Sequence, residues 1–85
     1  MLDRMQRDKR LSPRHISLLL ALLSAWQSSG FAESFRVTRR ELMRRGRIAS
    51  TATYHKSIAE LTEFRYIDYQ PSYHPREGSR VRFLL

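Results

Sequence analysis

The chain has 85 residues, of which 16 are Lys or Arg and eight are Asp or Glu, and its formal net charge is +8. This length allows one domain with a single modest core. Because there is no cysteine, a disulfide scaffold and a thiolate metal site are excluded. His15, His55 and His74 lie far apart in the chain, so we expect no metal and no cofactor. No apolar run approaches the roughly 20 residues of a membrane span, and we expect a cytoplasmic protein with no membrane contact.

Arginine supplies nearly all of the positive charge, since Lys9 and Lys56 are the only lysines. Guanidinium groups match phosphate oxygens and the guanine edge. A basic surface of this density favours a polyanionic partner, and a surface charged only for solubility is the alternative. A membrane-surface role is not expected, because no segment pairs a lysine-rich face with exposed Trp or Phe.

Residues 1–11 carry alternating charge with few apolar positions. We expect a basic N-terminal arm or a short helix there, followed by one domain over residues 12–85. Arg7, Lys9 and Arg10 could reach a phosphate backbone from this segment.

A first long helix is predicted over residues 13–29. Ser12 suits the N-cap, Pro13 suits the first helical position, and Gly30 follows the end. Helical spacing gives a main apolar face and a flanking one: Ile16, Leu19, Leu20, Leu23 and Trp26 on the first, Leu18, Leu22 and Ala25 on the second. The flanking face is either covered by the N-terminal arm and residues 83–85, or it forms a homodimer interface through Leu18, Leu22 and their neighbours.

A short second helix follows the linker at residues 31–35. Thr38 and Glu41 form the T-x-x-E pattern of a capping box, and Gly46 is expected to stop the helix. Four arginines project from it: Arg39, Arg40, Arg44 and Arg45. So many cations on a short helix repel one another unless an anion lies near.

A third helix is predicted over about residues 51–63, with Ser50 as its N-cap and Arg47 in the turn before it. Tyr54, Ile58 and Leu61 share its buried face by their spacing. Short polar and basic side chains are left for the outer face of this helix.

In the C-terminal part of the chain the spacing of apolar residues changes from the helical period to alternation. Residues 65–70 and 80–85 alternate in polarity and contain many β-formers, and the loop between them carries two prolines and a glycine. We therefore expect a two-stranded hairpin with a basic tip.

The predicted fold class is α+β, mainly α with a small β-hairpin. Three helices followed by a two-stranded wing is the order of a winged helix-turn-helix domain. The N-terminus of the third helix favours phosphate, and its side chains can reach base edges in a major groove about 12 Å wide. The arginines of the second helix lie where the first helix of such a motif crosses the backbone, and the wing over residues 71–80 adds a second basic contact to the backbone or minor groove.

The segment "STATYHKSIAELTEFRYI" resembles the bacterial winged-helix transcription-factor superfamily, and the likeness extends over about residues 35–83. A narrower similarity joins "ATYHKSIAEL" and "YIDYQPSYHPREGS" to small helix-turn-helix proteins carried by bacterial mobile genetic elements. The resemblance implies that Thr51, Thr53, His55 and Lys56 face the DNA groove and that Arg76 and Arg80 lie on the wing. Arg65 stands where a glycine often ends the helix in that family.

The sequence thus predicts a sequence-specific double-stranded DNA-binding protein, either a small transcriptional regulator or a mobile-element accessory factor. The predicted DNA-binding residues are Arg39, Arg40, Arg44, Arg47, Ser50, Thr51, Thr53, His55, Lys56, Arg76 and Arg80. An enzyme is not expected, because the chain has no metal pair, glycine-rich phosphate loop or paired carboxylates. The alternative function is a protein–protein adaptor that uses the helix over residues 13–29 as its interface. RNA binding is disfavoured by the lack of an aromatic platform on the sheet.

Overall fold

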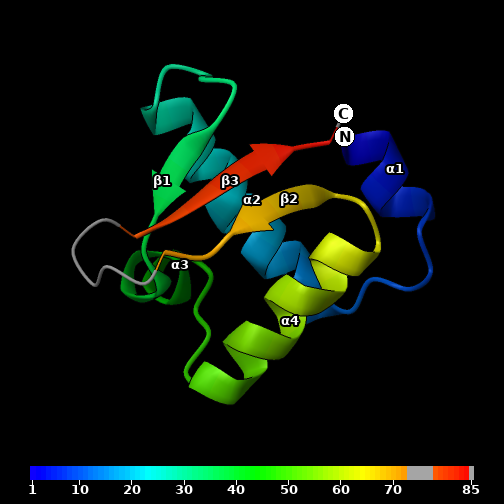
Figure 1. The fold of residues 1–85 in the computed structure, drawn as a ribbon. Coiled ribbons are helices and arrows are strands. Elements are labelled where there is room, and N and C mark those ends of the chain that lie inside the picture. Colours follow the sequence, from blue (N-terminus) through cyan, green and yellow to red (C-terminus); the bar gives the residue numbers. More distant parts are fainter. Residues whose placement is uncertain (73–77, 85) are drawn as a thin grey trace.

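The computed structural model describes residues 1–72 and 78–84, which form an α+β fold of helices packed against one small antiparallel sheet (Figure 1). The helices are α1 (Leu2–Arg7), α2 (Pro13–Ser28), α3 (Arg39–Arg45) and α4 (Thr51–Glu63). The strands are β1 (Phe35–Val37), β2 (Ile67–Gln70) and β3 (Ser79–Phe83), in the sheet order β1-β3-β2. The predicted α+β class is therefore confirmed.

One element was missing from the predicted architecture, which had a basic arm or short helix over residues 1–11, three further helices and a two-stranded hairpin. Residues 2–7 form the short helix α1. Residues 35–37, of which only Phe35 fell in the predicted linker, form the strand β1. In the antiparallel register Phe35 lies opposite Val81 and Val37 lies opposite Ser79, so β1 makes the sheet three-stranded. A strand of three residues is too short to show an alternating pattern, and its extended state depends on pairing with β3.

Helix α2 lies behind the sheet in Figure 1 and supplies much of the core. Leu18 and Leu22 are fully buried, with 0% of their surface exposed, so of the two alternatives for this face the structure favours cover within the chain and does not support a homodimer interface through these residues. The apolar stripe of α2 is wide because the helix packs against α3, α4 and β1 within one chain. Leu20, which was placed on the main core face, is instead 52% exposed.

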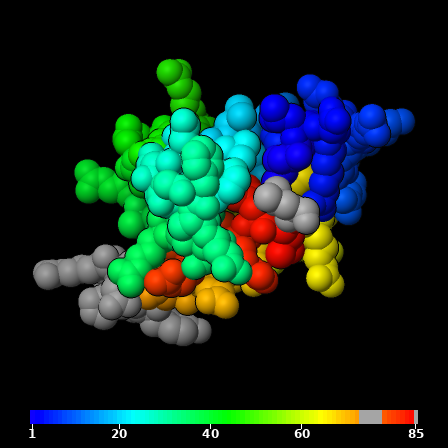
Figure 2. Space-filling model, turned by 90° about the horizontal axis from the view of Figure 1, so that it is seen from above, coloured from blue at the N-terminus to red at the C-terminus, as the bar shows by residue number. Residues whose placement is uncertain are grey.

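Helix α1 is fastened to the end of α4 and to the C-terminal strand. Met5 is buried in the core, and the Arg4 guanidinium donates hydrogen bonds to the carbonyls of Phe64 (2.7 Å), Arg65 (3.0 Å) and Leu84 (3.4 Å). The same guanidinium lies 3.9 Å from the centre of the Tyr66 ring. In Figure 2 α1 (dark blue) lies beside the end of β3 (red).

The polar contacts of Asp8 extend this fastening. Arg10 binds the Asp8 carboxylate through Nε and Nη2 at 2.9 and 2.8 Å, and the Tyr66 hydroxyl donates to it at 2.8 Å. The hydrogen bond from Arg10 holds the pKa of the Asp8 carboxyl well below its usual range. Burial and the hydrogen bond to Asp8 raise the pKa of Tyr66. Residues 4–10 are thus tied to the segment that follows α4.

The turn between α3 and α4 differs from the prediction in one respect. Gly46 has φ −86°, which any residue adopts, and the left-handed position falls on Arg47 with φ +54°. A glycine is needed at residue 46 because a side chain there would have too little room. Its Cβ would lie 3.0 Å from the Leu42 carbonyl oxygen and 3.4 Å from that of Ser17. Gly46 therefore lets α2 and the end of α3 approach closely, and Arg47 makes the turn.

Candidate nucleic-acid interface

Helix α4 runs along the lower edge of the molecule in Figure 1, with its N-terminal end projecting from the fold. Its first turn is capped as expected, because the Ser50 hydroxyl accepts a hydrogen bond of 3.2 Å from the Thr53 backbone N–H. The buried side of the helix consists of Tyr54, Ser57, Ile58 and Leu61. The predicted core positions of this helix are confirmed.

Tyr54 anchors α4 to the sheet. Its side chain is 1% exposed, and burial raises its pKa, with a further electrostatic contribution from Tyr69 of β2. The Tyr69 hydroxyl in turn shares a hydrogen bond of 2.9 Å with the Ser79 hydroxyl of β3. The burial of Tyr54 near Tyr69 therefore holds α4 against the sheet.

The outer face of α4 carries His55 and Lys56, both exposed, together with the exposed alanines Ala52 and Ala59. Small side chains at residues 52 and 59 let another surface approach the helix closely, while the longer side chains reach outward from either side of them. The sequence prediction missed both alanines. Their spacing from Tyr54, Ile58 and Leu61 places them on the opposite face, and that signal was available.

The hydroxyl residues at the start of α4 do not form one group. Thr51 is exposed, whereas Thr53 is half-buried and lines a hollow beside α2. Ser50 lines the same hollow, and its oxygen is already used as the helix cap. Of the predicted hydroxyl contacts, Thr51 is therefore the most freely presented.

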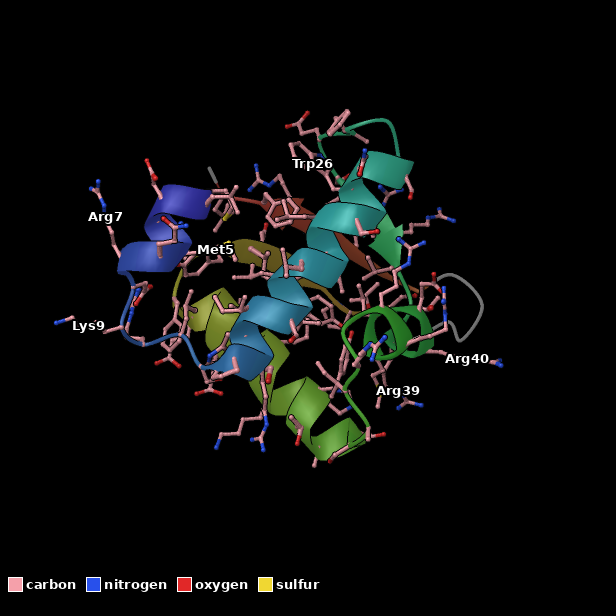
Figure 3. All side chains as sticks on the ribbon, turned by 180° about the vertical axis from the view of Figure 1, so that it is seen from behind. Met5, Arg7, Lys9, Trp26, Arg39 and Arg40 are labelled. Atoms are coloured by element: carbon pink, nitrogen blue, oxygen red, sulfur yellow. The ribbon has the colours of Figure 1, made fainter. Side chains whose placement is uncertain are left out.

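The four arginines of α3 divide into two pairs. Arg44 and Arg45 both bind the Glu41 carboxylate, at 2.7 and 2.6 Å, and these hydrogen bonds lower the pKa of Glu41. Arg39 and Arg40 point away from the fold (Figure 3) and form no ion pair with another residue in the described part of the chain. Glu41 thus relieves the repulsion between Arg44 and Arg45, and the α3 arginines with no ion pair among the described residues are Arg39 and Arg40.

Two other predicted DNA-binding residues, Arg47 and Arg80, lie in different parts of the fold. Arg47 is exposed in the turn and lines the hollow with Ser50 and Thr53. Arg80 lies on the outer face of the sheet, where it donates a hydrogen bond of 3.0 Å to Ser34 and is paired in register with Arg36. It is not grouped with the side chains of α4. Arg76 and most of the predicted wing tip lie outside the described residues.

Arg14 is a candidate that sequence reasoning missed. It occupies the second position of α2, is exposed, and lines the same hollow as Arg47. Nothing in its local pattern indicates this, because Arg14 and Arg47 meet only when α2 packs beside the α3–α4 turn.

No family model, curated protein or solved structure matches this chain. Within residues 1–72 and 78–84, no cluster of three or more His, Cys, Asp or Glu side chains could hold a metal ion. Across that same part of the chain, none of the helices has the length and apolar character needed to cross a membrane.

Proposed function

We propose that the protein binds double-stranded DNA in a sequence-specific manner, with α4 as the recognition helix in the major groove. In this account α2, α3 and α4 form the helical part of a winged helix-turn-helix domain, and β2 and β3 form the base of its wing. A small transcriptional regulator or an accessory factor of a mobile element is the corresponding role.

The observation that carries the proposal is the combination of an open face on α4 with unpaired cations around it. His55 and Lys56 project between two alanines, and Arg39, Arg40 and Arg47 border the helix without an ion pair in the described residues. The carboxylates of Asp8, Glu41 and Asp68 are all bound to arginines elsewhere in the fold. Four cations on or beside α4 thus have no ion pair in the part of the chain that the structure describes, as a phosphate partner requires: Arg39, Arg40, Arg47 and Lys56.

The side chains of this face suit base edges as well as phosphates. The ammonium of Lys56 can donate to guanine O6 and N7 or to a phosphate, and the His55 ring can donate or accept. Ala52 can contact the methyl group of thymine. A helix with side chains measures about 10–12 Å across, which matches the major groove of about 12 Å.

The test is selection of bound sequences from random duplex DNA, followed by titration of the enriched duplex. We expect an enriched motif and a loss of roughly tenfold in affinity for Lys56→Ala, the value of one charged hydrogen bond. Arg36→Ala is the control, because Arg36 is an exposed cation of β1, and β1 lies on the side of the molecule away from α4 (Figure 1). No enrichment and no duplex binding at low salt would refute the proposal.

The adaptor alternative has less support. An interface on α2 could no longer use Leu18 or Leu22, and it would centre on the exposed Leu20. The neighbouring positions Ser24 and Gln27 are exposed and polar, so this face offers one leucine and no broad apolar patch. If Lys56→Ala and Arg39→Ala left DNA binding unchanged, the adaptor function would gain.

A further inference from the structure

Two hollows adjoin along the side of α4 that faces α2. The first, of about 310 Å³, lies between the start of α2, the α3–α4 turn and the first turn of α4. The second, of about 280 Å³, lies between the segment before α2 and the middle of α4. Arg14 and Thr53 line both of them, so together they form one furrow, which we call the α2–α4 groove.

The walls of the α2–α4 groove are positively charged. Arg14, Arg47 and Lys56 line it, all three are exposed, and none forms an ion pair within the described residues. Among the described residues Glu60 is the one acidic side chain that lines it, and its carboxylate already accepts a hydrogen bond of 3.3 Å from His15. His15 Nε2 is the donor there, because its Nδ1 accepts from the Ser12 backbone N–H at 2.8 Å.

This groove and the arginines of α3 lie on different flanks of α4. Arg39 is close enough to the Tyr54 hydroxyl to oppose the rise in its pKa, so Arg39 lies on the flank of α4 where Tyr54 approaches Tyr69 of the sheet. In Figure 3 the chain at Lys9, which leads into the groove, lies at one side of the molecule, and Arg39 and Arg40 lie at the other, with α4 running below and between them. Cations therefore border α4 on both sides.

A helix that fills the major groove has the sugar-phosphate backbone of one DNA strand on each side. We propose that the α2–α4 groove holds the backbone of one strand, with Arg14 and Arg47 contacting the same phosphate, while Arg39 and Arg40 contact the other strand. The inference rests on the proposed DNA-binding function and assigns to Arg14 a contact that the local sequence does not indicate. The groove has no exposed aromatic side chain on which a base could stack, so a backbone fits it better than an unpaired base.

Phosphate-ethylation interference on the selected duplex tests this directly. The wild-type protein is expected to show interfering phosphates on both strands. Arg14→Gln should weaken the interference on one strand, and the double variant Arg14→Gln/Arg47→Gln should remove it and reduce the slope of log affinity against log salt by about 1, the contribution of one phosphate contact. Arg36→Gln, at an exposed arginine of β1 that is given no phosphate contact, should change neither.

A second pair of variants separates binding from folding. Arg47 and Arg65 both have left-handed backbones, with φ of +54° and +66°, where glycine is free of strain. Arg47→Gly and Arg65→Gly should therefore both raise the midpoint of thermal unfolding, and only Arg47→Gly should weaken duplex binding, by roughly tenfold. A weaker binder that is more stable has not lost affinity by unfolding.

The outcomes are distinguishable. If the wild-type protein binds no duplex, the proposed function fails and the groove assignment fails with it. If the wild type binds but Arg14→Gln and Arg47→Gly bind equally well, or if interference is confined to the strand near α3, the groove assignment alone is overturned.

Discussion

Asp8 shows how a single side chain links distant parts of this chain. Its carboxylate accepts hydrogen bonds from Arg10 and from Tyr66, which lies beyond α4. Because Arg10 lowers the pKa of Asp8 in the folded protein, the ionised carboxylate stabilises the fold at any pH above its ordinary value of about 4. That stabilisation is lost as the pH falls below this value and the group is protonated.

We therefore predict that acid unfolding depends on Asp8. Asp8→Asn should lower the free energy of unfolding at pH 7, and the variant should lose less additional stability than the wild type between pH 4 and pH 2. The measurement is urea unfolding as a function of pH. Asp3→Asn is the control, because Asp3 is exposed on α1 and has no ion pair in the described residues. Parallel pH profiles for wild type and Asp8→Asn would contradict this account.

At the level of single residues, the sequence predicted which side chains of α4 are buried better than it predicted the backbone of the turn before this helix. Tyr54, Ile58 and Leu61 repeat at helical spacing, and that spacing alone places them on one face. The left-handed position at Arg47 could not be predicted, because glycine is the usual residue there and Gly46 stands next to it. The glycine is explained instead by the approach of the Ser17 carbonyl, a tertiary contact.

Among the elements, α1 stabilises the end of α4 through hydrogen bonds. Arg4→Ala removes three hydrogen bonds from a cation to backbone carbonyls, so we predict a loss of about 2 kcal/mol in the free energy of unfolding. Arg7→Ala, on the exposed side of the same helix, should change it by less than about 0.5 kcal/mol. Denaturant titration measures both, and equal effects would show that α1 is not fastened through Arg4.

The base of the wing depends on Gly78. Its φ is +68°, and a Cβ there would collide with the carbonyl oxygen of Val37 at the end of β1. Gly30 is the matched control, because its φ is +77° but no atom lies within 4 Å of an added Cβ. We predict that Gly30→Ala costs about 1 kcal/mol of unfolding free energy from backbone strain alone.

Gly78→Ala should cost clearly more than Gly30→Ala, by at least about 1 kcal/mol, because the collision with Val37 adds to the strain. The same denaturant titration compares the two variants. Equal losses would mean that β1 and the wing base yield easily to the extra methyl group.

Elements with strong local signals were predicted well, and the others were not. The bounds of α4 agree with the expected residues 51–63 because its cap and apolar spacing are both present in the sequence. The strand β1 has no such signal, since its extended form comes from pairing with β3 late in the chain. The burial of Leu18 and Leu22 likewise depends on three neighbouring elements that pack around α2.

For the whole molecule, the distribution of charge could be predicted only in part. Composition predicted the excess of arginine, but not that Glu41 binds Arg44 and Arg45 while Arg39 and Arg40 have no ion pair within residues 1–72 and 78–84. The α2–α4 groove brings Arg14 beside Arg47 only in the folded chain. The candidate DNA surface is thus a tertiary arrangement of cations around α4.

The salt dependence of duplex binding tests this surface most directly. If Arg39, Arg40 and Lys56 each neutralise one phosphate and Arg14 and Arg47 share a fourth, log affinity should fall against log salt with a slope of about −3.6, a loss of roughly 150-fold between 0.05 and 0.2 M. A titration of the selected duplex by the wild-type protein over that range gives this slope. A slope between 0 and about −1, or no binding at the lowest salt, would contradict the central claim.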